Sequence, residues 1–325
     1  MNSTRRALAG DTLESVLGPI SADELRWVHA HEHLCADFAQ REGRRLDAFP
    51  GNLEYVRRAL KRMLGELPQY GVNGLVDPMP LGVGRDEVYV RLAQEVSQTS
   101  GVSIFLATGI YLPGHWPEWV TAATAEELAS HFVREAEEGI EGTGVKPALI
   151  KVAAKSLGPD EEKALTAAAL AHRRTGLHLH CHVTNYRRPI VELLTGLGIP
   201  GRCIYLAHAD MNTSEEEWLW LVEQGVGLVM TNWDYPYHMD QAEALRLTRL
   251  LLTRGYQDRL LIGLDFGMEI IDRSRTAIWT WDNPDRTSYS YLHTGVLPKL
   301  RAAGVTEEDL EWMMHRNPVE MLRRG

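Results

Sequence analysis

Short apolar segments alternate with amphipathic segments along the chain, from about residue 27 onward. The apolar segments are rich in aliphatic and β-branched residues and are short enough to be buried strands. Eight segments are predicted to be strands: Trp27–His31, Gly74–Asp77, Ser103–Gly109, Ala148–Val152, Leu177–His182, Cys203–His208, Val226–Thr231 and Leu260–Asp265. Because strand and helix alternate throughout, the pattern predicts an α/β fold in which parallel strands close into a (β/α)8 TIM barrel.

The intervening segments carry apolar residues at three- and four-residue spacing, which is typical of helices that pack one face against a sheet. The clearest are Leu53–Leu64, Asp86–Ser97, Ala125–Gly139, Asp160–Thr175, Glu215–Glu223, Ala242–Thr253 and Glu307–Arg316. Thr213, followed three residues later by Glu216, predicts a capping box at the start of one of these helices. Pro318 is expected near the end of the last helix.

The sequence shows no composition break and no low-complexity linker, so one domain is expected over residues 1–325. Residues 1–26 would form an N-terminal lead-in to the first strand. Residues 266–290 would form a long loop over the barrel mouth, where it could act as a lid.

Composition excludes several function classes. The net charge is −10 and no basic run is present, which argues against a nucleic-acid partner. No apolar stretch is long enough for a secretory signal or a membrane span, and the three cysteines have no CxxC spacing. These features predict a cytoplasmic protein that acts on a small-molecule substrate.

Residues with metal-ligating side chains stand at the ends of the predicted strands. The candidates are His31, His33, Lys151, His182, His208 and Asp265. The C-terminal ends of barrel strands meet at one mouth, so these side chains are expected to converge there. His31 and His33 point to the same side of an extended chain and can share one ion. Glu32 alternates to the opposite face and is expected to support the site. A lone histidine is more often a hydrogen-bonded core residue, but the whole set favours a two-metal centre.

Lys151 is the unusual candidate, because an ammonium group beside metal ions is electrostatically unfavourable. Burial lowers the pKa of a lysine, and the neutral amine can react with carbon dioxide. The product, N6-carboxylysine, is a lysine carbamate whose negative charge and two oxygens can bridge two cations. The alternative is a lysine that binds an anionic substrate group. Lys155 is the competing position, but it follows the predicted strand end and is expected at the loop surface or in contact with substrate.

Asp265 is predicted to bind a metal and to accept the proton of the attacking water, which makes it the candidate catalytic residue. An aspartate after an apolar strand is otherwise often a helix cap, but here the chain continues Phe-Gly-Met-Glu. Asp77 and Asp210 are expected to support the structure around the site. His178 and His180 are expected to be satisfied interior residues, because only the last inward residue of their strand reaches the mouth.

Several segments together resemble the phosphotriesterase family of the amidohydrolase superfamily, in particular its lactonase type. They are LGPISADEL, HEHL, ATGIY, EGIEGTGVKPALIKVA, TGLHLHCH, IYLAHAD and LPKLRAAGVTEEDLEWMMHRNP, and they extend over nearly the whole chain. The resemblance implies two divalent metal ions, usually zinc, with cobalt or manganese as alternatives. It assigns His31, His33 and Asp265 to the buried metal, His182 and His208 to the exposed metal, and carboxylated Lys151 to the bridge.

The resemblance implies a metal-bridging hydroxide that attacks the carbonyl of a lactone or carboxylic ester, while Asp265 takes the proton. The alternative is a phosphoester or organophosphate hydrolase with the same centre. Tyr111 stands where lactonase members have a pocket tyrosine, although it could also be an interior packing residue. The proton-relaying aspartate and histidine of true phosphotriesterases are replaced by Met211 and by Asn232 or Trp233. The arginine that lactonases carry in the loop after the seventh strand is also absent.

Four residues are predicted to contact the substrate: Tyr111, Trp233, Arg273 and Arg275. The arginines of the expected lid could bind a carboxylate or phosphate, and a solvated loop with incidental charge is the alternative. Related barrels suggest a homodimer by analogy. A catalytically silent barrel that only binds a ligand is disfavoured, because every expected metal ligand is present.

Overall fold

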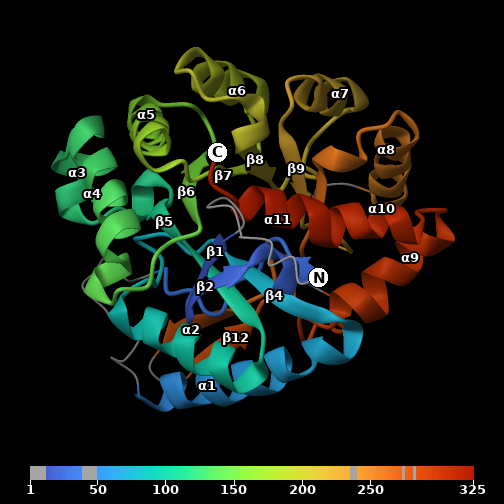
Figure 1. Cartoon of the computed structure of the whole chain (residues 1–325), viewed down its shortest axis with the longest axis horizontal. Coiled ribbons are helices and arrows are strands. Elements are labelled where there is room, and N and C mark those ends of the chain that lie inside the picture. Colours follow the sequence, from blue (N-terminus) through green and yellow to red (C-terminus); the bar gives the residue numbers. More distant parts are fainter. Residues whose placement is uncertain (1–11, 39–49, 235–239, 273–274, 281–282) are drawn as a thin grey trace, which may run out of the picture.

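The computed structural model describes residues 12–38, 50–234, 240–272, 275–280 and 283–325. Its centre is an eight-stranded parallel sheet in which neighbours in sequence are neighbours in space. Its strands are β3 (Trp27–His29), β4 (Val72–Asp77), β5 (Ser103–Ile110), β6 (Leu149–Ala154), β7 (Leu179–Val183), β8 (Ile204–Ala207), β9 (Gly227–Met230) and β10 (Leu260–Ile262). Helices surround the strands (Figure 1). The predicted TIM barrel is therefore confirmed.

Backbone hydrogen bonds join the first and last strands of this sheet. The Ala30 amide donates to the Ile262 carbonyl (3.1 Å), and the Asp265 amide donates to the His31 carbonyl (3.1 Å). These bonds place the segment after β3 beside the segment after β10. As a result, His31 and Asp265 become neighbours although they lie near opposite ends of the sequence.

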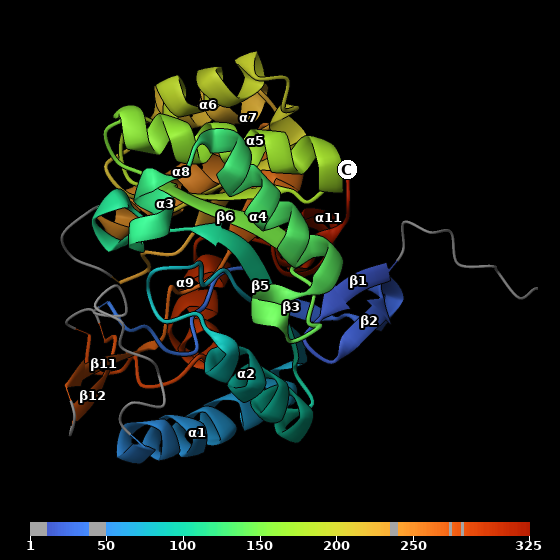
Figure 2. The ribbon, with the colours of Figure 1, turned by 90° about the vertical axis from the view of Figure 1, so that its left-hand side faces the viewer.

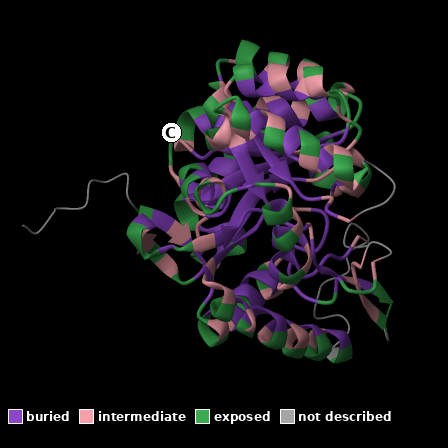
Figure 3. Ribbon diagram, turned by 90° about the vertical axis from the view of Figure 1, so that its right-hand side faces the viewer, coloured by how far each residue is buried: buried purple, intermediate pink, exposed green. Residues whose placement is uncertain are grey.

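The helices present buried faces to the strands and exposed faces to solvent (Figure 3). They are α1 (Pro50–Gly65), α2 (Glu87–Ser100), α3 (Glu118–Ala122), α4 (Ala125–Glu138), α5 (Pro159–Thr175), α6 (Arg187–Gly196), α7 (Glu215–Glu223), α8 (Gln241–Thr253), α9 (Leu297–Ala302), α10 (Glu307–Glu311) and α11 (Asn317–Leu322). The periodic pattern predicted most of the long helices, but not α6, whose start is obscured by two arginines and a proline.

Two helix ends differ from prediction. The N-cap of α7 is Ser214, whose hydroxyl accepts a hydrogen bond from the Glu217 amide, so the predicted cap at Thr213 is wrong by one residue. At the C-terminal end, α10 passes into a π-helical turn, Trp312–Arg316, and then into α11. Pro318 therefore lies at the second residue of α11, directly after the π-helical turn.

Two β-hairpins lie outside the barrel, at opposite ends of the molecule (Figure 2). The described part of the N-terminal lead-in forms β1 (Thr12–Ser15) and β2 (Gly18–Ser21). The described part of the predicted lid contains β11 (Met268–Asp272) and β12 (Arg275–Ile278), so this segment is not an irregular loop.

The barrel interior is filled by one buried apolar cluster, and a larger cluster lies between the strands and the helices. Leu149 belongs to the interior cluster, and strand alternation places Lys151 on the same inward face. Cys35, Cys181 and Cys203 are buried and form no disulfide. Among the described residues, no helix is long and apolar enough to cross a membrane.

Candidate metal centre

His31, His33 and Asp265 meet at the mouth of the barrel. Nε2 of His31 lies 3.3 Å from Nε2 of His33, and Oδ1 of Asp265 lies 3.4 Å from each of these nitrogens. A tetrahedral ion with bonds of about 2.0–2.1 Å holds its ligand atoms about 3.3–3.4 Å apart. The three donor atoms therefore have the spacing that a single ion such as zinc requires, and they form a group that could hold a metal.

His182 and His208 form a second group beside the first. Nδ1 of His182 lies 2.7 Å from Nε2 of His208, and the rings of His31 and His208 have centroids 5.1 Å apart. At 2.7 Å the two nitrogens are at hydrogen-bond distance. A shared tetrahedral ion would need them to separate to about 3.3 Å. Both nitrogens point toward one another at the rim of the same mouth.

Lys151 reaches this mouth from β6. Its side chain is buried, and its Nζ has no hydrogen-bond partner within the described ranges. Burial lowers the pKa of Lys151 from its ordinary value of 10.5 to about 8. Burial is the main cause of the lowered pKa of His182 and of His208, and the charge of Lys151 lowers both further. A buried amine without a partner and with a lowered pKa is chemically suited to form a carbamate.

Gly109 on β5 allows β6 to approach closely enough to place Lys151. The two residues pair in the sheet, and Gly109 has a φ of +118°. A Cβ at this position would lie 1.8 Å from the carbonyl oxygen of Lys151. Only glycine fits both the backbone conformation and the short distance.

The candidate histidine ligands are oriented through their second ring nitrogens. The partners are His180 Nε2 for His31 Nδ1 (2.9 Å), Asp77 Oδ1 for His33 Nδ1 (3.1 Å) and Thr231 Oγ1 for His208 Nδ1 (2.8 Å). Such contacts fix the tautomer and the ring orientation of metal-binding histidines. Asp77 was expected to support the structure around the site, whereas His180 was expected to be an interior residue without a link to it. The alternation in LHLHCH signals only that His180 faces inward.

Glu32 holds the loop that carries Asp265. Its two carboxylate oxygens accept hydrogen bonds from the amides of Leu264 (3.0 Å) and Phe266 (2.9 Å), on either side of Asp265. One of these oxygens also lies 3.0 Å from Nδ1 of His29. The supporting role expected for Glu32 therefore has a specific form: it fixes both peptides that flank Asp265.

Charge within the centre favours a bound cation. Burial alone would raise the pKa of Asp265, but His208, His31 and His33 outweigh it and hold that pKa well below its ordinary value. Burial alone would lower the pKa of His33, but hydrogen bonds to Asp265 and Asp77 outweigh it and raise that pKa to about 9. The paired carboxylates thus stabilise positive charge at the point where the donor atoms converge.

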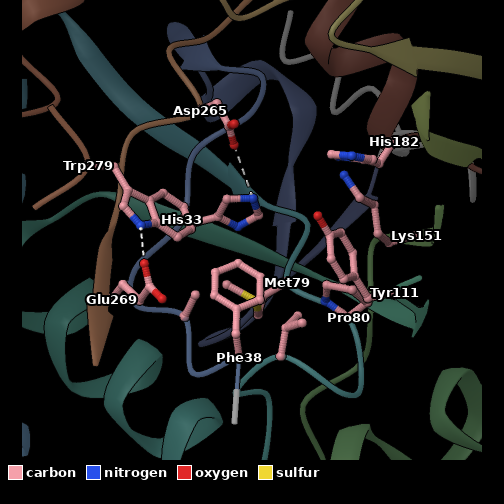
Figure 4. Close-up of a pocket in the computed structure, with 12 residues that line it drawn as sticks. His33, Phe38, Met79, Pro80, Tyr111, Lys151, His182, Asp265, Glu269 and Trp279 are labelled. Carbon is pink, nitrogen blue, oxygen red and sulfur yellow. Dashed lines mark hydrogen bonds and ion pairs between the residues drawn. The ribbon is translucent and has the colours of Figure 1, made fainter. Parts of the chain in front are cut away.

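Two cavities open beside the candidate ligands. One, of about 230 Å³, is mostly apolar and is lined by His33, Ala36, Phe38, Met79, Pro80, Val83, Tyr111, Lys151, His182, Asp265, Glu269 and Trp279 (Figure 4). The other, of about 390 Å³, is more polar and is lined by Tyr111, Lys155, His182, Thr184, Asn185, His208, Met211, Asn212, Asn232 and Asp265. Tyr111 borders both cavities, and its ring centroid lies 5.3 Å from that of His182.

The other predicted substrate contacts lie elsewhere or outside the described residues. Trp233 is buried and lines neither cavity, and its carbonyl accepts a hydrogen bond from the buried Arg286. Arg275 is exposed on β12 and pairs with Asp272 at 3.4 Å. Arg273 lies outside the described residues. Contacts of these three residues with a substrate stay predictions.

Sequence reasoning did not anticipate the role of Phe38, Met79 and Glu269 in lining the apolar cavity. Phe38 and Met79 come from loops that carry no strand or helix signal, and Glu269 lies on β11, within the segment expected to cover the mouth. Lys155, expected at the loop surface or in contact with substrate, lines the polar cavity.

A sequence model of the phosphotriesterase family matches residues 11–322. The chain belongs to the phosphotriesterase family. Among relatives of this phosphotriesterase-family chain, the phosphotriesterase homology protein of Escherichia coli is 25% identical over 94% of this chain and 100% of its own length. The aryldialkylphosphatase of Saccharolobus solfataricus is 24% identical over 92% of this chain and 95% of its own. The N-acetyltaurine hydrolase of Xenopus tropicalis is 23% identical over 95% of this chain and 97% of its own length.

Solved structures of phosphotriesterase-family proteins share the fold. The organophosphorus hydrolase of Deinococcus radiodurans superposes with a TM-score of 0.84 at 26% identity, covering 99% of this chain and 100% of that one. An organophosphate hydrolase engineered from a weak promiscuous lactonase template has a TM-score of 0.84 at 26% identity. The match covers 96% of this chain and 99% of that one. As a member of the phosphotriesterase family, the chain is a metal-dependent hydrolase.

Proposed function

We propose that this phosphotriesterase-family hydrolase opens a lactone or a similar carboxylic ester at a centre of two divalent cations, most commonly zinc. The residues proposed to hold the cations are His31, His33, His182, His208, Asp265 and Lys151 in its carboxylated form. The observation that carries this proposal is the convergence of these side chains on one mouth: a donor triangle with edges of 3.3–3.4 Å, an imidazole pair and an unpartnered amine.

The residues at the barrel mouth are suited to bind two divalent cations. Three of the imidazoles have a second ring nitrogen engaged by the protein, which leaves the first free for a cation. Cobalt or manganese would be alternatives to zinc in a site of mixed nitrogen and oxygen donors. When bound, the cations would activate water and polarise the carbonyl oxygen of the ester.

The protein itself supplies proton transfer, orientation and a sheltered cavity. Asp265 is ionised at neutral pH because its pKa is held well below the ordinary value, so its carboxylate can accept a proton as water attacks. Tyr111 borders both cavities and can orient the acyl group between them. Phe38 and Trp279 line the apolar cavity and give it apolar walls.

Lactones and carboxylic esters are favoured because the described lining of the polar cavity holds no second carboxylate that could pass a proton on from Asp265. Asp210 is the nearby candidate, but its oxygens accept hydrogen bonds from the Thr231 and Asn232 amides. Met211 lines the polar cavity and cannot carry a proton. A phosphotriester is the second candidate substrate, since the names of several relatives describe organophosphate hydrolysis.

Initial rates on a panel of lactones, phosphotriesters and N-acyl amides test the proposal. The enzyme would be loaded with zinc or cobalt in the presence of bicarbonate, and D265N would serve as the inactive reference. We expect lactones to be hydrolysed with the highest kcat/KM. Faster hydrolysis of phosphotriesters would favour the second candidate. Full activity after exhaustive chelation would contradict the metal-dependent centre itself.

A further inference from the structure

The apolar cavity contains one carboxylate that the proposed chemistry does not use. Glu269, on β11, lines the cavity together with Phe38, Tyr111 and Trp279. Figure 4 shows Glu269 and Trp279 on one side of this cavity, and Lys151 on the other. Glu269 therefore lies across the cavity from Lys151.

Glu269 is held firmly, and no described residue forms an ion pair with it. Its Oε2 accepts a hydrogen bond from Nε1 of Trp279 at 3.1 Å, and its backbone pairs with Ala277 and bridges to Ala36. Within the described part of the chain, none of the ion pairs includes Glu269, in contrast to Asp272 on the same hairpin, which pairs with Arg275. A carboxylate among apolar groups loses solvation and gains most from a positive partner.

Aromatic rings surround the same space. The ring of Phe38 has its centroid 6.1 Å from that of Trp279 and 6.2 Å from that of Tyr111. The electron-rich faces of such rings attract organic cations, and a desolvated cation gains more than an exposed one. Aromatic rings with one carboxylate form a recognition site for an ammonium group, whereas neutral alkyl chains would gain nothing from Glu269.

We propose that this cavity selects substrates whose remote end carries an organic cation, such as an alkylammonium group. The cation would lie against Phe38, Tyr111 and Trp279 with Glu269 as its counter-ion. This inference rests on the proposed function only for the placement of the scissile bond near the metal centre. Substrates with an anionic remote end would be repelled by Glu269.

Binding of an isosteric pair of probes to the metal-loaded protein tests the proposal. Choline and 3,3-dimethylbutanol have nearly the same shape and the same hydroxyl group, but only choline is charged. Titration calorimetry should show choline bound roughly tenfold more tightly, from an electrostatic and cation–π contribution of ordinary size. E269Q should remove this preference. D272N, which removes the same charge from the same hairpin outside the cavity, should keep it.

A second variant guards against a folding defect in E269Q. Phe38→Leu keeps an apolar surface but removes a ring face, so it should weaken choline binding and leave 3,3-dimethylbutanol binding unchanged. Equal binding of the two probes, no detectable choline binding, or a choline preference that survives E269Q would overturn the proposal. Because binding is measured without turnover, these results are independent of whether lactones are hydrolysed.

Discussion

Replacement of Glu32 by glutamine should weaken metal binding without removing any metal ligand. The two oxygens of Glu32 each accept one backbone amide, from Leu264 and from Phe266. A glutamine amide has one oxygen and one NH2 group, so in either orientation its NH2 faces one of these N–H donors. A buried donor left without an acceptor costs about 1–3 kcal/mol, and this cost falls on a peptide adjacent to Asp265.

Two measurements separate the local effect from general destabilisation. Chemical denaturation followed by tryptophan fluorescence should show E32Q less stable by about 2 kcal/mol. Chelator competition should show metal affinity reduced about 10–100-fold, the usual effect of losing a group that supports a ligand. The matched control is E135Q, since Glu135 is a buried carboxylate that binds Arg85 and Thr108 instead.

The outcome for the control decides the interpretation. E135Q should lose stability to a similar extent but retain its metal affinity. The reasoning about Glu32 would be refuted if E32Q kept wild-type metal affinity despite a loss of stability. It would also be refuted if E135Q lost as much metal affinity as E32Q.

Three further predictions concern the backbone, the pH dependence of stability and the chemistry. G109A should destabilise the protein by more than about 3 kcal/mol and impair metal loading, because the added methyl group would overlap the Lys151 carbonyl; denaturation and metal content would show this. Burial alone would raise the pKa of Glu135, but Arg85 and other partners outweigh it and lower that pKa below 4.5. The stability that the Glu135–Arg85 ion pair contributes is therefore fully present above pH 4.5 and should be lost as the pH falls through the folded-state pKa of Glu135. In acid denaturation, E135Q should not show this loss. D265N should lower kcat by about 10²–10⁴-fold with an unchanged circular dichroism spectrum, and near wild-type turnover would exclude Asp265 as the proton acceptor.

The barrel was predictable because each of its strands is buried on both faces. Such strands appear in the sequence as short apolar runs, and the predicted run Ala148–Val152 differs from β6 by only one or two residues at each end. The hairpin β11–β12 was not predictable, because the apolar alternation of β11 extends only from Met268 to Ile270 and β12 is mostly half-buried. A loop was the natural interpretation of that segment.

The candidate ligand residues could be nominated from the sequence, but the residues that hydrogen-bond to them and orient them could not. Strand ends and residue types were sufficient to nominate Lys151 and Asp265. The contact between His180 and His31 depends on how two non-adjacent strands face each other across the barrel, which the sequence does not encode locally. The contact between Glu32 and the amide of Phe266 likewise joins residues far apart in the chain, through backbone groups that have no sequence signature.

Two of the candidate ligands occupy strained backbone positions. Asp265 has a φ of 51° and His208 a φ of 59°, in the left-handed region that costs a residue other than glycine of order 1 kcal/mol or more. A buried polar side chain holds each turn: Glu32 binds the amides around Asp265, and Arg187 donates to the His208 carbonyl at 2.9 Å. The left-handed turn directs each ligand into the mouth rather than along the strand. Because both supporting side chains are buried, the strained turns persist only while the surrounding barrel is folded, which couples assembly of the centre to folding of the barrel.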